Sequence, residues 1–518
     1  MTEPADRIFR NAEVHTLSAP DSAADAATSE RAGRHADEPH EAVAVRDGRV
    51  LRVGDGDEVG FLEGVATDVI DCEGGVLLPG FVDAHTHMEV LGRRLVHADL
   101  GAATDRENAI ARLADAPGDD WILGYGYDES TWPSGRFLTR EDLDAVSTDT
   151  PVVAFREDLH TASVNSLVLE RYADDLPADD VTREAGEPTG VVTEGAAEFL
   201  RMETAPGHEE TKRLVEAARD YAHERGVTGV HDMVRRSHAP AAYRELAVAD
   251  DLQLRVRLYY WTDHLDAVEE LGLASDHGSD HVEVGGIKTY TDGSIGAGTA
   301  KLTGPYADRD GTGEWVVTPD ELADVVDRAE ARDLQLAVHA IGDEAVRVAL
   351  EALPDDPDAR HRIEHAELLP PDLEPSAFHA VASMQPNFLR WARDGGLYHD
   401  RLGEARTASS NRFADIQAAG VPLAFGSDGM PLSPLYGVEQ TVTAPESGQR
   451  LGVTDALRAY TAGAAYAGRA EDRFGTVEPG KCADFVVLSE SPWAVDPGDI
   501  ADIPVAMTVV DGEVVHRA

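Results

Sequence analysis

Short apolar runs alternate with segments of helical period through the middle of the chain, between Gly80 and Gly426. This alternation is typical of βα units, in which each parallel strand is followed by a helix that packs against the sheet. Eight runs are present, the number that closes a (β/α)8 TIM barrel. The predicted strands are Gly80–Ala84, Gly229–Asp232, Leu252–Tyr259, Val282–Tyr290, Leu336–Ala340, Arg362–His365, Val381–Gln385 and Pro422–Gly426.

Both ends of the chain have a different pattern, in which apolar and polar residues alternate around Asp-Gly pairs. Residues Ala42–Val53 and Ala506–Val515 each contain such a pair, which is a strong signal for a β-hairpin. Residues Ser18–Glu38 are small and polar, and predict an exposed loop. We therefore expect a small composite β-sandwich formed by residues 1–78 and 473–518, flanking a barrel of residues 79–472.

The first and second barrel strands are separated by an unusually long stretch of sequence. The gap is about 140 residues, far more than one barrel helix and its loops require. We expect residues 95–220 to form an insertion over the mouth of the barrel.

Composition narrows the possible partners. The 518 residues include 97 acidic and 45 basic ones, a formal net charge of -52, which excludes nucleic-acid binding through a basic surface and argues against an anionic membrane as partner. Only Lys212, Lys288, Lys301 and Lys481 are lysines. An acidic, lysine-poor composition is typical of halophilic organisms, where molar salt shortens the Debye length to ~3 Å. The hydrophobic content of 42% argues against a disordered acidic chain.

Two cysteines exclude a disulfide scaffold and a cysteine-rich zinc site. The first residues lack the apolar core of a signal peptide, and no stretch approaches the ~18 apolar residues of a membrane span. We expect a cytoplasmic protein with a small-molecule substrate.

Histidines and an aspartate follow several of the predicted strands. His85 and His87 are two residues apart at the end of the first strand, so their side chains lie on the same face. His339, His365 and Asp428 lie at the ends of the fifth, sixth and eighth strands. Each of these alone is more commonly an ordinary polar loop residue, a buried core histidine or a helix cap. Because barrel strands present their carboxyl ends at one rim, the five together favour a metal centre.

Lys288 lies within the apolar fourth strand, in a chain that uses arginine almost everywhere else. A primary amine can be carboxylated by CO2 to give a carboxylate that bridges two cations, whereas a guanidinium cannot. The alternative is a buried lysine that forms an ion pair with Asp292 or Glu364.

These motifs resemble those of the amidohydrolase superfamily and, within it, the amidohydrolase-3 (YtcJ-like) family. The resemblance covers nearly the whole chain and is carried by LLPGFVDAHTH (77–87), YGYDESTWP (125–133), PTGVVTEGA (188–196), IKTYTDGSIGAGTA (287–300), AVHAIGDEAV (337–346), RIEHAELL (362–369), SMQPNF (383–388), FGSDGMPLSPL (425–435) and GTVEPGKCADFVVL (475–488).

The resemblance implies a binuclear metal centre with the ligands His85, His87, Lys288, His339, His365 and Asp428. The first two histidines and Asp428 hold the buried ion, the other two histidines hold the second, and carboxylated Lys288 bridges them. Asp428 is also the general base, and His365 is the other implied catalytic residue. Two zinc ions per chain are expected, with iron, manganese or nickel as alternatives. Such a centre lowers the pKa of a shared water towards ~7 and supports hydrolysis of a non-peptide, amide-type C–N bond.

The substrate pocket is less defined. Its candidate residues are Trp132, Arg156, His160, Asp292 and Asp343, although a structural or ligand-supporting role is an alternative for each. The family's Asp-Gly-His sequence reads Asp158-Leu159-His160 here, so the local turn can differ. A mononuclear deaminase-type or cyclic-amidohydrolase-type relative with a structural Lys288 is a second hypothesis, and a non-catalytic scaffold a third. A homodimer is compatible with base rates.

Overall fold

The computed structural model describes residues 4–18, 39–118, 120–157 and 160–518. The predicted loop at 18–38 lies, apart from Ser18, outside the described residues, as do Asp158 and Leu159. The chain divides into two compact units. The first contains Met1–His87, Arg219–Arg236 and Tyr243–Ala518, and the second contains Met88–Ala218 and Ser237–Ala242.

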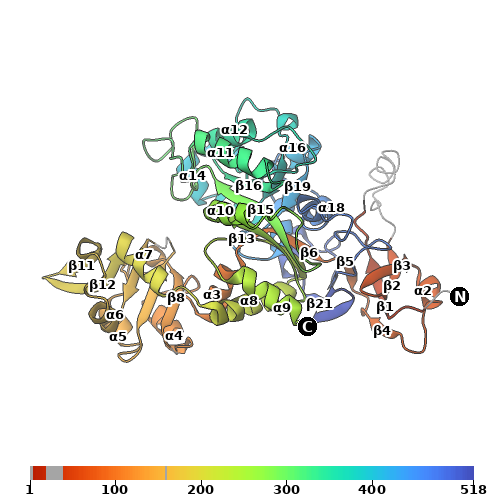
Figure 1. Ribbon diagram of the computed structural model, residues 1–518, viewed down its shortest axis with the longest axis horizontal. Helices are drawn as coiled ribbons and strands as arrows, with labels where there is room; N and C mark the ends of the chain where they lie inside the picture. The colour runs from red at the N-terminus through yellow and green to blue at the C-terminus, as the bar shows by residue number, and fades with distance from the viewer. Residues whose placement is uncertain (1–3, 19–38, 119, 158–159) are drawn as a thin grey trace. The chain divides into compact units, whose positions relative to one another are not determined.

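A parallel eight-stranded barrel forms the centre of the first unit (Figure 1). Its strands follow the chain in order, and each hydrogen-bonds to the next. All eight predicted strands are confirmed, and the barrel fold with them. The strands are β6 (Phe81–Thr86), β13 (Val227–Val234), β14 (Arg255–Trp261), β15 (Val282–Tyr290), β16 (Gln335–Ala340), β17 (Arg362–His365), β18 (Val381–Met384) and β19 (Leu423–Phe425).

The first and last strands of the barrel meet at their carboxyl ends. The backbone N–H of Asp428 donates to the carbonyl of His85 over 2.7 Å. Asp83 strengthens this contact, because its Oδ1 accepts from the N–H groups of His85 (3.1 Å) and Ser427 (3.0 Å). Gly426 permits the approach, since a Cβ there would lie 2.3 Å from the His85 nitrogen. The closure therefore places Asp428 beside His85, near the end of β6, and His87, which follows it.

Helices cover the outside of the barrel, and Figure 1 shows α11, α12 and α16 on the outer side of β15, β16 and β19. The helices that follow the barrel strands are α9 (Ala239–Val248), α10 (Leu265–Glu270), α11 (Pro319–Glu330), α12 (Asp343–Ala352), α13 (Leu389–Ala392), α14 (Leu397–Leu402), α15 (Glu404–Ala408), α16 (Phe413–Ala418), α17 (Pro434–Val442), α18 (Val453–Ala459) and α19 (Ala462–Ala467). The barrel interior is unusually polar, because Arg362, Lys288 and Glu364 are fully buried there.

Strands from both ends of the chain join one further sheet, as the sequence predicts. Its β5 pairs antiparallel with β20, so that Leu77 lies opposite Val487. The Asp-Gly pairs form the expected hairpins, with φ of 51° and 71° at Asp47 and Gly48. The strands are β1 (Arg7–Val14), β2 (His40–Arg46), β3 (Arg49–Gly54), β4 (Asp68–Asp71), β5 (Val76–Pro79), β20 (Phe485–Leu488), β21 (Val505–Val510) and β22 (Glu513–Arg517), with the short helix α2 (Gly56–Gly60).

Arg255 connects the barrel to this terminal sheet. Its guanidinium donates to both oxygens of Asp484 at 2.5 and 2.9 Å, and to Asp511 in the β21–β22 turn at 2.6 Å. Arg255 and Asp484 are almost fully buried. This paired charge cluster fixes the hairpin to the start of β14.

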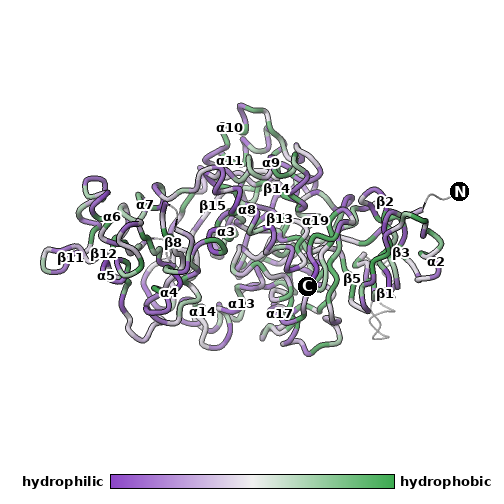
Figure 2. The backbone as a smooth tube through the Cα atoms, turned by 90° about the horizontal axis from the view of Figure 1, so that it is seen from below, coloured by the Kyte–Doolittle hydropathy of each residue, from purple (hydrophilic) through white to green (hydrophobic). Residues whose placement is uncertain are grey.

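The second unit contains a six-stranded mixed sheet, which the sequence analysis did not predict beyond placing an insertion in this region. Its strands are β7 (Ala98–Asp99), β8 (Ile122–Tyr127), β9 (Val152–Arg156), β10 (Thr161–Val164), β11 (Val181–Glu184) and β12 (Glu187–Thr193). The associated helices are α3 (Met88–Val96), α4 (Arg106–Asp115), α5 (Arg140–Asp144), α6 (Ser166–Arg171), α7 (Glu194–Glu203) and α8 (His208–His223). Figure 2 shows hydrophobic residues on interior strands such as β5, and hydrophilic residues on exposed turns such as that between β11 and β12. Among the helices described, none has the length and apolar character needed to span a bilayer.

Candidate metal centre

Four histidines and one aspartate meet at the carboxyl ends of the barrel strands. The ring centroids of His85 and His87 are 5.7 Å apart, those of His85 and His365 4.9 Å, and those of His365 and His339 4.5 Å. Asp428 lies against the first pair. The structure thus brings together the side chains that the strand-end pattern singled out.

His85, His87 and Asp428 form a compact group. The Oδ1 atom of Asp428 lies 3.2 Å from Nε2 of His87 and 3.7 Å from Nε2 of His85. One candidate ligand atom from each residue lies within 4.8 Å of the others, so the three could hold a metal ion. Among the described residues, these are the three histidine, cysteine or carboxylate side chains whose ligand atoms come this close together.

Each histidine has one ring nitrogen engaged by an oxygen acceptor, which leaves the other available as a ligand. Nδ1 of His85 donates to Glu364 (2.6 Å), Nδ1 of His87 donates to the carbonyl of Met233 (2.9 Å), and Nδ1 of His365 donates to Gln385 Oε1 (2.6 Å). In His339 the roles are exchanged, because Nε2 donates to the carbonyl of Gly293 over 3.1 Å. Nδ1 of His339 and Nε2 of His85 and His365 are therefore free to bind a cation, whereas Nε2 of His87 is hydrogen-bonded to Asp428 Oδ1 over 3.2 Å.

Two of these residues depend on left-handed backbone. Arg362 and Glu364 share the inner face of β17, so strand alternation would turn His365 outward. A φ of 72° at His365 and of 45° at Ala366 breaks the alternation and turns the ring into the barrel. Asp428 has a φ of 55°. Such conformations cost about 1–2 kcal/mol in a non-glycine residue and are concentrated at functional sites.

Lys288 lies on β15 with its side chain fully buried. Its Nζ has no hydrogen-bond partner among the residues described. Neither alternative ion pair forms, because Glu364 is engaged by Arg362 and His85, and Asp292 by backbone N–H groups. Burial lowers the pKa of Lys288 to about 8. An unpartnered buried amine is the feature that a carboxylated lysine requires before it is modified.

The electrostatics favour neutral imidazoles and an ionised aspartate. Burial, together with neighbouring positive groups, holds the pKa values of His85, His339 and His365 well below their ordinary value. Burial would raise the pKa of Asp428, but its hydrogen bond with His87 and the surrounding positive charges lower it to about 2. Asp428 in turn raises the pKa of His87, whose burial acts in the opposite direction. A bound cation would replace the proton shared by these last two residues.

Asp292 and Asp343 lie beside the metal-ligand candidates and make backbone contacts. Asp292 accepts from the N–H groups of Ile341 (3.1 Å), Gly342 (2.9 Å) and Lys301 (2.7 Å), and so fixes the turn that follows His339. Asp343 accepts from the N–H of Thr303 over 3.0 Å and from its hydroxyl. Both aspartates therefore connect the loop after β15 to the start of α12.

The other three pocket candidates belong to the second unit. Trp132 is buried and its Nε1 donates to the carbonyl of Ala103 over 3.0 Å. Arg156 pairs with Glu129 (2.9 Å) and Asp128 (3.3 Å). The exposed ring of His160 pairs with Glu194 over 3.2 Å. Their roles towards a substrate stay predictions.

Sequence reasoning missed the residues that support the histidines. The sequence analysis names Glu364 only as an alternative ion-pair partner of Lys288, and Arg362 and Gln385 only as parts of predicted strands. The available signal was an arginine and a glutamate two residues apart in a strand predicted to be buried on both faces.

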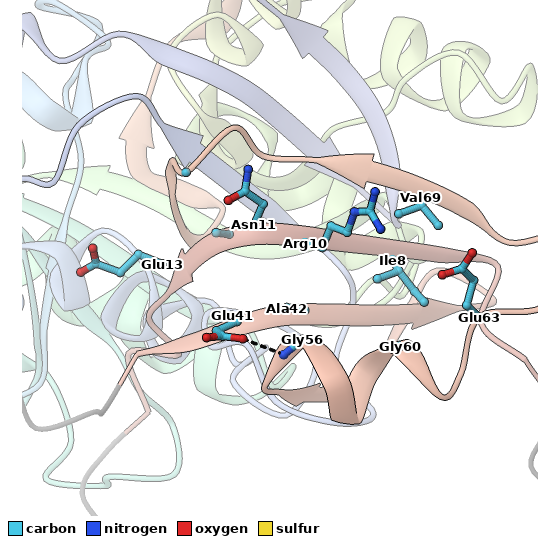
Figure 3. Close-up of a pocket in the computed structure, with 12 residues that line it drawn as sticks. Ile8, Arg10, Asn11, Glu13, Glu41, Ala42, Gly56, Gly60, Glu63 and Val69 are labelled. Atoms are coloured by element: carbon cyan, nitrogen blue, oxygen red, sulfur yellow. Dashed lines mark hydrogen bonds between the residues drawn. The ribbon is translucent and has the colours of Figure 1, made fainter.

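A separate cavity of about 580 Å³ lies on the terminal sheet (Figure 3). Arg10, Asn11, Glu41 and Glu63 line it, and Glu41 accepts from the N–H of Gly56 over 3.0 Å. None of the described residues that line it is a histidine or cysteine. The barrel rim therefore remains the candidate site.

Comparisons with known proteins identify the family and the fold of the chain. The sequence model of the amidohydrolase family matches residues 68–516. The chain is 31% identical to YtcJ of Bacillus subtilis (strain 168), whose name places it among amidohydrolases, over 92% of this chain and 96% of that protein. It is 24% identical to N-substituted formamide deformylase of Arthrobacter pascens, over 99% and 98%. The crystal structure of an uncharacterized metal-dependent hydrolase from Pyrococcus furiosus superposes with a TM-score of 0.79 at 30% identity, covering 94% of this chain and 99% of that one.

Proposed function

Because the chain belongs to the amidohydrolase family, we propose that it is a metal-dependent hydrolase that cleaves a non-peptide C–N bond in a small amide-type substrate. The observation that carries the proposal is the group of His85, His87 and Asp428, with ligand atoms within 4.8 Å of one another, on the same barrel as the unpartnered Lys288.

We assign two divalent ions, with zinc as the first choice, to this rim. His85, His87 and Asp428 would hold one ion, and His339 and His365 would hold the second. Lys288 would join them after carboxylation, in which the neutral amine adds to CO2, forms an N–C bond and releases a proton. The Lys288 amine, which has no hydrogen-bond partner among the residues described, and the ring nitrogens opposite the supporting acceptors are the basis of this assignment. Bound together, two such ions supply a hydroxide at neutral pH and polarise a carbonyl.

Asp428 is the proposed proton carrier. Its low pKa keeps it ionised, so its carboxylate can accept a proton from the attacking water and then deliver it to the departing nitrogen. His365 contributes its Nε2 atom to the site. Gln385 fixes the orientation of the ring, because its Oε1 accepts from Nδ1 of His365 over 2.6 Å. Asp292 holds the turn after His339, and Asp343 holds the neighbouring loop. Their engaged oxygens support positioning roles over direct substrate contact.

The predicted domain division belongs to the same proposal, with residues 1–78 and 473–518 as a β domain and residues 79–472 as the catalytic barrel. Residues 95–220 are proposed to cover the barrel mouth and to supply Trp132, Arg156 and His160 to the pocket. The charge of -52 and the scarcity of lysine support a proposed cytoplasmic enzyme of a halophile, without nucleic-acid or membrane partners. A homodimer is its proposed assembly.

A mononuclear relative is the second candidate, because only one group of three ligands assembles from unmodified side chains in the described part of the chain. The test is metal analysis of purified protein in molar salt, combined with a screen of formamides, N-acyl compounds and cyclic amides. Two zinc ions per chain and turnover of one amide class support the proposal. One ion per chain with an unmodified Lys288 refutes the bridged centre, and a zinc-loaded protein inert towards the whole panel refutes the hydrolase.

A further inference from the structure

A buried ion pair lies beneath the candidate metal centre. Arg362 and Glu364, two residues apart on β17, are both fully inaccessible to solvent. Nε of Arg362 donates to Oε1 of Glu364 over 2.7 Å, and Nη2 donates to Oε2 over 3.0 Å. A bidentate, desolvated pair of this kind is costly to bury unless every remaining donor and acceptor is satisfied.

The pair is satisfied by contacts that cross the barrel to β6. Oε2 of Glu364 accepts from Nδ1 of His85 over 2.6 Å, and Nη2 of Arg362 donates to the carbonyl of Ala84 over 2.5 Å. Strands β6 and β17 are not neighbours in the sheet. The ion pair therefore acts as a strut that joins two consecutive residues of β6 to the strand that carries His365.

Further contacts of the Arg362 guanidinium complete the strut. Nη2 also lies 2.8 Å from Ser383 Oγ on β18. Nη1 donates to the Tyr259 hydroxyl on β14 (3.1 Å) and to Nδ1 of His231 on β13 (2.7 Å). Because these partners come from three further strands, the guanidinium can neither rotate nor withdraw without breaking several hydrogen bonds. The carboxylate of Glu364 is consequently held in one position against the ring of His85.

We propose that Glu364, oriented by Arg362, is a positioning residue that fixes His85 as the Nδ1–H tautomer and makes its ion the more tightly bound of the two. This inference rests on the proposed binuclear function. An ionised carboxylate can only accept, so the proton lies on Nδ1 and the lone pair of Nε2 faces the ion. A charged acceptor also raises the basicity of a ligating imidazole.

The four histidines differ in this respect. His87 and His339 donate to backbone carbonyls, and His365 donates to the neutral amide of Gln385. His85 alone, among the four, donates its Nδ1–H to a carboxylate. The contact of His87 with Asp428 is made by Nε2, the nitrogen that would face the ion, and Nε2 of His339 lies 3.6 Å from Asp292 Oδ1, beyond hydrogen-bond distance. The ion that His85, His87 and Asp428 would hold thus combines a charged ligand with a ring supported by a carboxylate, whereas the rings of His339 and His365 are supported only by neutral acceptors.

The test is a zinc titration of metal-free, full-length protein in competition with a chromophoric chelator. Wild type should fill in two steps. Glu364→Gln, which keeps the size and an acceptor oxygen but removes the charge, should weaken the tighter step about 10- to 100-fold and leave the weaker step unchanged. Gln385→Leu should do the reverse. Asp484→Asn is the matched control, because it removes the charge from another buried carboxylate that pairs with both ends of an arginine, Arg255, and contacts none of the candidate ligands. It should leave both steps unchanged.

The inference is overturned if Glu364→Gln leaves the tighter step at its wild-type affinity, or weakens both steps equally. If this variant does not fold, ¹⁵N NMR of the histidine rings in metal-free wild type replaces it, with the His85 signals assigned by comparison with His85→Gln. The Nδ1–H tautomer supports the inference, and the Nε2–H tautomer or an imidazolium refutes it. A wild-type chain that binds no zinc refutes the proposed function as well, which separates the two failures.

Discussion

Replacing Lys288 with methionine should stabilise the metal-free protein and at the same time strongly reduce the turnover of the metal-loaded protein. Methionine has nearly the length of lysine but no polar group to bury. A buried donor without a partner costs about 1–3 kcal/mol. The pKa of Lys288, lowered by burial from 10.5 to about 8, leads to a similar figure of about 3 kcal/mol, since each pKa unit corresponds to about 1.4 kcal/mol.

The sign of the pH dependence follows from the direction of this shift. The pKa of Lys288 is lower in the folded state than in the unfolded state. At any pH below about 8, burying the protonated amine therefore lowers the free energy of unfolding. The penalty fades as the pH rises towards about 10.5, where the unfolded lysine also loses its proton. The gain in the free energy of unfolding from Lys288→Met should therefore be about 1–3 kcal/mol at neutral pH and small at alkaline pH.

The assay is urea unfolding of chelator-treated wild type and variant in molar salt and CO2-free buffer, followed by circular dichroism at neutral and alkaline pH. Zinc content and turnover are measured after reconstitution. Turnover should fall by about 10³-fold, because a bridged metal pair supplies several kcal/mol of charge stabilisation. Lys301→Met is the control, since Nζ of Lys301 donates to Thr312 Oγ1 over 3.1 Å and its loss should not stabilise the protein. A Lys288→Met protein that is destabilised, or that keeps two zinc ions and full turnover, would refute the reasoning.

Three further predictions concern individual side chains. His339→Ala should abolish turnover while the circular dichroism spectrum in high salt is preserved, and unchanged turnover would remove His339 from the site. Asp428→Asn should lower kcat by about 10²–10⁴-fold, as expected for loss of a general base, and a wild-type rate would exclude that role. Asp511→Asn should lower the free energy of unfolding by about 1 kcal/mol at neutral pH, a value discounted because the Asp511 side chain is 37% exposed. Burial would raise the pKa of Asp511, but His281 and Arg255 lower it to about 2, so its stabilisation is present above the unfolded pKa of about 3.8 and lost as the pH falls towards 2. The urea midpoints of wild type and variant should therefore converge as the pH falls towards 2. Midpoints that still differ there would contradict this account.

The barrel could be predicted from sequence because its strands carry two independent signals. Each of the eight is an apolar run, and several end in a histidine or aspartate that the rim gathers. Lys288 was recognisable for a chemical reason, since the chain uses arginine for nearly all of its other basic residues. Local pattern and topology agree at His85 and His339, so the convergence of these two side chains could be expected from the sequence.

Other features depend on contacts that no local pattern records. The pairing of Glu364 with His85 joins positions 279 residues apart, and nothing near either residue indicates it. The alternation rule would even have placed His365 on the outer face of β17, and only the left-handed backbone reverses this. The six-stranded sheet of the second unit was missed because it mixes parallel and antiparallel pairs, so no regular strand–helix repeat marks its strands along the chain.

The pairing of β5 with β20 has a consequence for biosynthesis. Leu77 leaves the ribosome early, but its partner Val487 follows about 400 residues later. At a translation rate of roughly 5–20 residues per second, this delay lasts tens of seconds. During that time the edge of β5 is an open template for another nascent chain. Newly made copies therefore need either a chaperone to shield this edge or a slow enough encounter rate between polysomes, and truncation before β20 should produce aggregates rather than a shorter enzyme.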